Sequence, residues 1–376
     1  MRIGITLLSL DPTWGGIGTY TEAIIKHLLM VDKENEYVLM YPGFGAPHKM
    51  FGQYRKYKNA TEVETESSRL PSPSYWDQVV VPKVAKKYGI DVLFSPRMSV
   101  PIQGRFKKVM IVHGVERHMV PDILTWKLYV KWFFMERMIL PAADRVISIS
   151  NVMTQDFRRT IKYPIEKVRT VYHGVSKEFR VIHDADRLLR VKGEYELPDA
   201  FILFVGHLYP NKNFGNLVRA LHLLANKIPH DLVVVGRPRW KYGGDLALIE
   251  SLGLRDRVHF LYFIPQEDLV ALYNLASCFV FPSFYESFGL VLLEAMACGC
   301  PVAGARTGAI PEISAGAAAL FDPYNYEEIA DTILRVVSDH EGLRQSCIEK
   351  GLARAKVFSW ERCATETLKV LEEVAA

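Results

Sequence analysis

Short apolar runs alternate along the chain with longer amphipathic stretches, a pattern that predicts βα units with parallel strands and helices on both faces of each sheet. A first series of predicted strands covers residues 2–8, 37–41, 92–95, 108–112, 145–148 and 168–172. A second series covers 201–205, 232–235, 258–260, 278–281, 301–304 and 318–321. We therefore expect an α/β protein with two Rossmann-like domains whose parallel sheets face a central cleft, the usual place for ligands in such folds.

The domain boundaries follow from the segment between the two series. Residues 176–200 are charged and contain no long apolar run, as expected of a linker. The chain has 376 residues, a length that suits two domains. We predict a first domain over 1–178, a second over 179–358 and a terminal helix over 359–376, in which Leu368, Leu371 and Val374 recur at three-residue intervals.

Composition excludes several protein classes. Apolar residues make up 49% and charged residues 23%, as in globular proteins. No apolar run approaches the ~18 residues needed to span a bilayer, and the N-terminus lacks a signal-peptide pattern, so we expect a cytoplasmic location. A net charge of +4 is too small to indicate a nucleic-acid partner. The five cysteines have no CxxC spacing, which favours reduced structural thiols over a metal site.

The positive charge is concentrated in one region that is also aromatic. Residues 104–137 contain seven basic and three acidic side chains. Within 124–137, the sequence LTWKLYVKWFFMER could form a helix on the inner face of a membrane, with contacts from Trp126, Lys127, Lys131 and Trp132. The alternative is a helix that packs on the sheet.

Two segments contain candidate phosphate-binding groups. Gly15 and Gly16 follow the first strand and precede a predicted helix over 22–29, where backbone amides attract phosphate, although a plain glycine turn has the same pattern. After the strand 278–281, Glu286 and Glu294 flank a helix predicted to begin at residue 288 or 289. The two carboxylates would bracket an anion bound at the helix start. Alternatively, Glu286 caps the helix and Glu294 pairs with a lysine.

The stretch 286–294 resembles the E-x7-E motif of the family 4 retaining glycosyltransferases, which have the GT-B fold. The agreement extends over 269–276 (LVALYNLA), 281–283, 299–302 and 311–312, and thus over nearly all of the second domain. In the first domain it rests on 15–16, 91–94, His113, 143–145 and 148–150. Residues 358–360 resemble the family's ending, where a helix crosses back to the first domain.

The resemblance implies roles for individual residues. Glu294 would hold ribose, and Glu286 would bind the transferred sugar. The amides around Phe288, Gly289, Leu290 and Val291, with those of Gly15 and Gly16, would bind phosphate. The loop after Gly206 commonly has Arg and Lys five positions apart on the diphosphate; Lys212 matches, whereas His207 departs from the pattern and has less dependable charge. His113 would face the sugar and Ile264 the nucleobase. Without this resemblance, Lys212 could be a solvated residue and His113 an ordinary histidine at a strand end.

The implied reaction is retaining transfer of a hexose from a nucleoside diphosphate sugar to a hydroxyl of a saccharide or glycolipid, as in polysaccharide or cell-envelope glycan synthesis. Catalysis would rest on His113, Lys212 and Glu286, with no metal and no cofactor. The DxD sequence at 184–186 lies in the linker and is interpreted as surface charge. Acceptor contacts are expected on loops 43–76 and 96–104. Alternatives are another GT-B nucleotide-sugar enzyme, such as an epimerase, and a non-catalytic nucleotide-sugar or glycan-binding protein.

Overall fold

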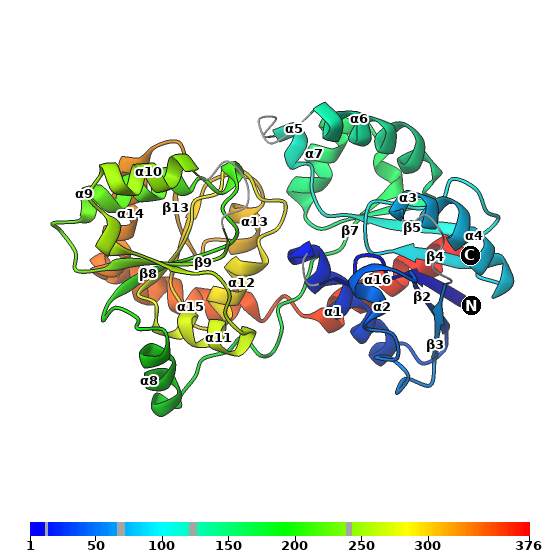
Figure 1. The fold of residues 1–376 in the computed structure, drawn as a ribbon, viewed down its shortest axis with the longest axis horizontal. Coiled ribbons are helices and arrows are strands. Elements are labelled where there is room, and N and C mark those ends of the chain that lie inside the picture. Colours follow the sequence, from blue (N-terminus) through cyan, green and yellow to red (C-terminus); the bar gives the residue numbers. More distant parts are fainter. Residues whose placement is uncertain (12–13, 66–71, 120–125, 238–242) are drawn as a thin grey trace. The chain divides into compact units, whose positions relative to one another are not determined.

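The computed structural model describes residues 1–11, 14–65, 72–119, 126–237 and 243–376, and they form two compact units (Figure 1). The first unit contains Met1–Val115, Leu124–Gly174 and Ser359–Ala376. The second contains Val175–Phe358 together with Glu116–Ile123. Before the terminal helix, the first unit therefore ends at Gly174, whereas the sequence predicted a domain boundary after residue 178.

Among the described residues, the sheet of the first unit has seven parallel strands in the order β3-β2-β1-β4-β5-β6-β7. Their bounds are β1 (Arg2–Thr6), β2 (Glu36–Tyr41), β3 (Ala60–Glu64), β4 (Val92–Ser95), β5 (Lys107–Val112), β6 (Arg145–Ser148) and β7 (Val168–Thr170). Strand β4 is buried along its whole length, as expected of a central strand covered by helices on both faces.

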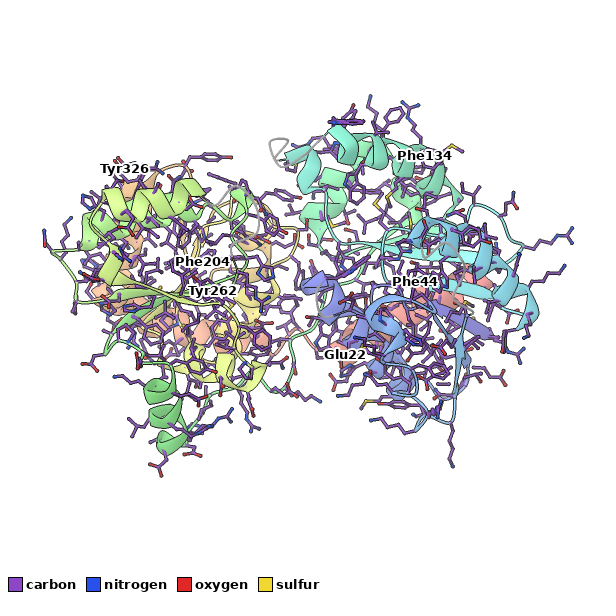
Figure 2. All side chains as sticks on the ribbon, viewed as in Figure 1. Glu22, Phe44, Phe134, Phe204, Tyr262 and Tyr326 are labelled. Atoms are coloured by element: carbon purple, nitrogen blue, oxygen red, sulfur yellow. The ribbon has the colours of Figure 1, made fainter. Side chains whose placement is uncertain are left out.

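The sheet of the second unit has six parallel strands within the described chain, in the order β10-β9-β8-β11-β12-β13. Their bounds are β8 (Phe201–Val205), β9 (Asp231–Val235), β10 (Val258–Leu261), β11 (Cys278–Phe281), β12 (Val302–Ala305) and β13 (Ala319–Phe321). Phe204, labelled in Figure 2, is buried in β8. The α/β fold and both parallel sheets agree with the prediction from the apolar runs.

Helices cover both sheets. The α-helices are α1 (Gly16–Val31), α2 (Gly45–His48), α3 (Pro73–Tyr75), α4 (Val81–Lys87), α5 (Glu116–Met119), α6 (Trp126–Phe134), α7 (Asn151–Ile161), α8 (Ala185–Glu194), α9 (Phe214–Leu224), α10 (Gly243–Ser251), α11 (Gln266–Leu275), α12 (Leu290–Ala297), α13 (Ile310–Ser314), α14 (Tyr326–Val337), α15 (Leu343–Ala355) and α16 (Trp360–Ala375). The terminal helix α16 packs against α1 and against β4, β5 and β6, all in the first unit. Its N-terminus is capped by the Ser359 hydroxyl, which accepts the Arg362 N–H at 3.1 Å.

Strand β3 and helix α8 lie in segments for which the sequence predicted a loop and a linker. Strand β3 lies at the edge of its sheet, beside β2, inside a segment that was predicted to be a loop. Its sequence ATEVE contains two glutamates and no continuous apolar run, which an edge strand does not need. The predicted linker contains helix α8, whose N-cap is Asp184; its Oδ1 accepts the Arg187 N–H at 3.0 Å. The DxD sequence is therefore a helix start.

The strand order places the candidate residues at particular sheet edges. In the second unit the order reverses between β8 and β11, because β9 follows on one side of β8 and β11 on the other. Loops at the carboxyl ends of such neighbouring strands diverge and leave room for a ligand. In the first unit the same reversal lies between β1 and β4. These two reversals are the topological switch points of the sheets, and the loops beside them are the candidate ligand-binding loops.

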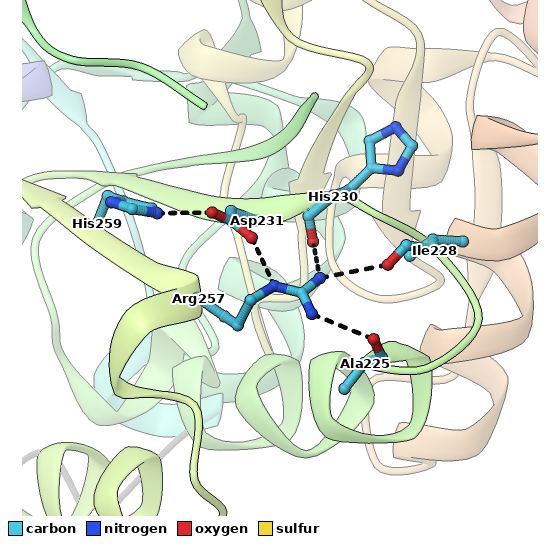
Figure 3. A network of polar contacts seen from close by, with 6 residues as sticks. All are labelled: Ala225, Ile228, His230, Asp231, Arg257 and His259. Carbon is cyan, nitrogen blue, oxygen red and sulfur yellow. Dashed lines mark hydrogen bonds and ion pairs between the residues drawn. The ribbon is translucent and has the colours of Figure 1, made fainter. Parts of the chain in front are cut away.

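The opposite, amino-terminal edge of the second sheet is held by an arginine (Figure 3). Arg257 donates to Asp231 Oδ1 at 2.5 Å and to the carbonyl oxygens of Ala225, Ile228 and His230 at 3.1, 3.3 and 2.7 Å. His259 Nε2 lies 2.8 Å from the other oxygen of Asp231. This network joins the end of α9 to the starts of β9 and β10, away from the carboxyl-edge loops, and we assign it a structural role.

Candidate functional site

The loops after β8 and β11 meet at the switch point of the second sheet and bring two predicted residues into contact. Lys212 ends a short 3-10 turn, Pro210–Lys212, and its Nζ lies 2.5 Å from Glu286 Oε1. The two side chains are 23% and 13% exposed. The ammonium also lies 5.6 Å from the centre of the Phe281 ring. Lys212 is therefore not an ordinary solvated lysine, and a charged pair forms across loops far apart in sequence.

The backbone of Glu286 is fixed by a neighbouring turn that the sequence analysis did not identify. Ala309 N–H donates to the Glu286 carbonyl at 2.8 Å. Gly308 has φ 54°, and a Cβ built there would lie 2.5 Å from that carbonyl oxygen. Only glycine allows this approach without displacing the chain. A glycine shortly after strand 301–304 was the available signal, but its partner became visible only in the fold.

Helix α12 begins later than predicted, at Leu290. Its N-cap is Gly289, with φ 101°, a conformation that few residues other than glycine adopt. Phe288 precedes the cap, is buried, and contacts the Phe358 ring edge-on at a centroid distance of 6.0 Å. The first-turn residues Leu290 and Val291 are half-buried, and amides in this position lack acceptors within the helix. The helix start therefore remains a suitable phosphate site, one residue further along.

Glu294 lies one turn inside α12, and the pKa of its carboxyl group is raised. Burial raises its pKa to about 7, although the Tyr273 hydroxyl, 3.3 Å from Oε2, opposes part of this increase. Glu294 forms no ion pair with any residue that the structure describes. The Glu286 carboxylate instead contacts Lys212, through Oε1. Of these two carboxylates, Glu286 is therefore the one beside a lysine, whereas the alternative interpretation gave the lysine to Glu294.

His207 has a defined tautomer in the loop after β8. Its Nδ1 accepts the Arg237 N–H at 3.1 Å, and Gly206 N–H donates to the Val235 carbonyl at 2.9 Å. A ring nitrogen that accepts a hydrogen bond carries no proton, so this contact favours a neutral imidazole. The structure thus agrees with the expectation that position 207 supplies less positive charge than an arginine would.

Ile264 lies in the loop between β10 and α11, at the carboxyl edge of the same sheet. It is half-buried, whereas the adjacent Tyr262 and Phe263 are 57% and 76% exposed (Tyr262 is labelled in Figure 2). Two strand spacings separate β10 from β8, which corresponds to about 10 Å. Ile264 is therefore on the sheet edge that carries Lys212, but in a separate loop.

The remaining predicted residues belong to the first unit. Gly15 is exposed and precedes the first residue of α1, Gly16. His113 follows β5, and its Nε2 lies 2.8 Å from the Pro96 carbonyl, which can only accept, so Nε2 carries the proton. Burial lowers the pKa of His113 to about 4 and keeps the ring neutral. The Tyr20 ring of α1 contacts it edge-on at 4.9 Å.

Helix α6 exposes apolar side chains instead of packing all of them on the sheet. Trp126, Tyr129, Phe133 and Phe134 are 74%, 62%, 53% and 55% exposed, and Figure 2 shows Phe134 on this helix. Trp132, predicted to contact a membrane, is half-buried. The side chains of the other two predicted contacts, Lys127 and Lys131, lie outside the described part of the chain. Sequence reasoning had not singled out Tyr129 or the two phenylalanines.

Three further observations concern metals, membranes and thiols. Within the described ranges, no three or more His, Cys, Asp or Glu side chains are placed to hold a metal ion. No helix in the described part of the chain has the length and apolarity to cross a bilayer. All five cysteines, which are among the described residues, are buried and free.

Comparisons with known proteins agree with this architecture. A family model described as glycosyl transferases group 1 matches residues 187–354, and one described as Glycosyltransferase Family 4 matches 14–179. Among solved structures, the chain is similar to sucrose-phosphate synthase from Thermosynechococcus elongatus, with a TM-score of 0.75, 21% identity and coverage of 99% of this chain and 98% of that one. Anabaena HepE in complex with UDP and glucose has a TM-score of 0.74, 19% identity and 99% coverage of both chains. At these identities, the structures show the fold alone.

Sequence relatives extend the agreement. O-antigen chain mannosyltransferase B from Escherichia coli is 32% identical over 232 residues, which is 61% of this chain and 60% of that protein. The serotype-specific mannosyltransferase WbdA, also from Escherichia coli, is 33% identical over 239 residues, 62% of this chain and 29% of that protein. The match thus spans less than two thirds of either relative. Because the two family models between them match most of the chain and the fold agrees, the chain belongs to the family 4 glycosyltransferases of GT-B fold.

Proposed function

We propose that this glycosyltransferase transfers a hexosyl residue, with mannose as the first candidate, from a nucleoside diphosphate sugar to a hydroxyl of a saccharide or glycolipid acceptor, with retention of configuration and without a metal ion. The observation that carries the proposal is the contact of Lys212 with Glu286 beside the start of α12. Mannose is suggested by the names of the Escherichia coli relatives. The UDP and glucose in the HepE structure support a nucleotide-sugar donor.

The chemical difficulty of this reaction is separation of charge. The anomeric carbon becomes oxocarbenium-like while the diphosphate departs as an anion, so catalysis requires fixed positive charge and dipoles at the leaving group. Lys212 supplies the charge, and the amides of Leu290 and Val291 supply aligned dipoles. His207, as a neutral ring, contributes at most a hydrogen bond. Lys212 is thus expected to be the main cationic contact of this site to the diphosphate.

The carboxylates position the donor. Glu286 is proposed to bind sugar hydroxyls and Glu294 the ribose, with Ile264 beside the nucleobase. In the first unit, neutral His113 is proposed to accept a hydrogen bond from a sugar hydroxyl through Nδ1, since Nε2 donates to the Pro96 carbonyl. Amides at Gly15 and Gly16 are proposed to contact phosphate. Retention follows if the acceptor attacks on the face that the diphosphate leaves, with a phosphate oxygen taking its proton.

Product analysis tests the reaction. The protein is incubated with UDP-, GDP- and ADP-hexoses, with and without manno-oligosaccharide acceptors, and released nucleoside diphosphate is measured. Acceptor-dependent release, an α-linked product from an α-linked donor, and unchanged turnover in EDTA are expected. Release without acceptor and with an epimerised sugar would favour the epimerase. Binding without turnover on any acceptor would favour a binding protein, and a strict requirement for Mn²⁺ or Mg²⁺ would contradict the metal-independent mechanism.

We also propose that the exposed face of α6 rests on an anionic membrane surface, where a glycolipid acceptor would be found. Aromatic side chains with a charged neighbour are typical of interfacial helices, and Arg137 lies 5.2 Å from the Phe133 ring centre. The triple variant Tyr129→Ser, Phe133→Ser, Phe134→Ser should lose co-sedimentation with phosphatidylglycerol-containing vesicles. The control Tyr324→Ser, which changes a side chain that is 70% exposed in the other unit, should retain it. Equal vesicle binding by the wild type, the triple variant and the control would contradict the proposal.

A further inference from the structure

Asn213 follows Lys212 directly and has a backbone conformation rare for a residue with a side chain. Its φ is 55° and its ψ 36°, in the left-handed region. Glycine suits this region best, and asparagine is one of the few alternatives. The turn by itself could therefore be made with glycine. The presence of asparagine raises the question of what its side chain does.

The side chain does not serve as an ordinary helix cap. Asn213 precedes α9, yet its side chain makes no bond to the N–H groups of that helix. Its amide nitrogen instead donates to the Pro282 carbonyl at 3.0 Å and to the Pro323 carbonyl at 2.6 Å. A side-chain amide has two donors, so both are used. The residue is only 5% exposed, and these bonds form in a desolvated environment where their loss is costly.

These two carbonyls place Asn213 between three loops at the carboxyl edge of the second sheet. Pro282 directly follows β11, in the loop that carries Glu286, and Pro323 lies in the loop after β13. A backbone bond from Phe284 N–H to the Asn211 carbonyl, 2.8 Å long, joins the first two loops a second time. The loop that carries Lys212 is thus attached on both sides of the lysine to the loop that carries Glu286.

We propose that Asn213 is a positioning residue of the donor site: its side-chain amide ties the loop of Lys212 to the loops after β11 and β13, and thereby sets where the Lys212 ammonium stands relative to the Glu286 carboxylate. The inference rests on the proposed function for its effect on catalysis. Asn213 itself need not touch the donor. A displaced ammonium would stabilise the departing diphosphate less well, because a shift of about 1 Å in a catalytic group can cost on the order of 100-fold in rate.

The test variant is Asn213→Gly, which keeps the left-handed turn and removes only the amide. Ala315→Gly is the matched control, since Ala315 has φ 46° in the same unit and no side-chain hydrogen-bonding group. Asn216→Ala is a second control: Asn216 donates to Pro323 at 3.0 Å but does not reach Pro282. If the tie to the Glu286 loop matters, only Asn213→Gly should change the position of Lys212.

Two measurements test whether Asn213 positions Lys212. In crystal structures of the unliganded proteins, Asn213→Gly should lose the contact between Lys212 Nζ and Glu286 Oε1, whereas both controls keep it. With the sugar nucleotide that the wild type uses, kcat/KM should fall about 10- to 100-fold for Asn213→Gly, but only about 3-fold or less when Lys212 is already alanine, since the two residues act through one contact. Folded fraction is checked by circular dichroism at the assay temperature.

The outcomes distinguish the positioning role of Asn213 from the proposed glycosyltransferase function. An unchanged Lys212–Glu286 contact in Asn213→Gly would overturn the positioning role, whatever the activity. An undiminished loss in the Lys212→Ala background would also overturn it, because Asn213 would then act on stability or elsewhere in the site. If the wild type neither binds UDP, GDP or ADP nor turns over their sugars, the proposed function fails, and the crystal structures still decide whether Asn213 positions the lysine.

Discussion

Replacement of Glu294 by glutamine should make the protein more stable above neutral pH and impair donor binding. In the folded chain the carboxyl pKa is raised from about 4.5 to about 7 by burial. Since one pKa unit corresponds to about 1.4 kcal/mol, the ionised form is disfavoured by up to about 3 kcal/mol. The side chain is half-buried, which lets water relieve part of this cost, so we expect about 1–3 kcal/mol.

The sign of the pH dependence follows from proton binding. Between pH 4.5 and 7 the folded state holds a proton on Glu294 that the unfolded state releases, so the wild type loses stability as pH rises through this window. Glutamine carries no charge at any pH. The variant should therefore match the wild type near pH 4.5 and exceed it most at pH 8, while its neutral amide can still bond the Tyr273 hydroxyl.

Calorimetric unfolding at pH 5 and pH 8 measures this difference. A gain of 1 kcal/mol corresponds to about 2–4 °C in Tm for a unit of this size. The same variant should bind the nucleoside diphosphate about 10- to 100-fold more weakly, because a charged acceptor for ribose hydroxyls is lost. A variant that is no more stable than the wild type at pH 8, or whose gain in stability is equal at pH 5 and pH 8, would refute the argument that a half-buried carboxylate without an ionic partner is retained for ligand binding.

Three other outcomes are expected. Gly308→Ala should lower the free energy of unfolding by about 1–3 kcal/mol and weaken binding of the sugar nucleotide, because the new Cβ would collide with the Glu286 carbonyl. Urea titration measures the loss of stability. Gly316→Ala is the control for backbone strain alone, since Gly316 has φ 82° and open space around it. Arg257→Leu should lower the free energy of unfolding by about 2–4 kcal/mol, because Asp231 Oδ1 and three backbone carbonyls lose their hydrogen bonds from Arg257. The Kd of the folded protein for the sugar nucleotide should not change, and weaker binding would contradict the structural role. Because burial lowers the pKa of His113 to about 4, the free energy of unfolding should decline as pH falls from 6.5 towards 4. His113→Gln should lessen this decline, measured by unfolding at several pH values. An unchanged dependence of stability on pH would show that the ring is not buried.

Local sequence determined the strands, and with them most of the fold. Strands buried on both faces require unbroken apolar runs, so β8 and β11 were recognisable from FILFV and CFVF alone. The residues that follow such strands lie at the carboxyl edge of the sheet, where ligands bind in these folds. Lys212 was named as a candidate from the family resemblance, and Glu286 from its place before a predicted helix start and from the same resemblance. Strand β3 escaped because an edge strand is only half-buried and its charged sequence has no distinguishing pattern.

Long-range packing decided the chemistry of those candidates. The contact of Lys212 with Glu286, the tie of Asn213 to Pro282 and the approach of Gly308 to Glu286 each join segments that the sequence separates by tens of residues. The exposure of the aromatic face of α6 and the raised pKa of Glu294 also depend on which neighbours exclude water. Apolar periodicity is a local property and can be read along the chain, whereas desolvation and hydrogen bonding between loops exist only once the sheet has brought distant residues together.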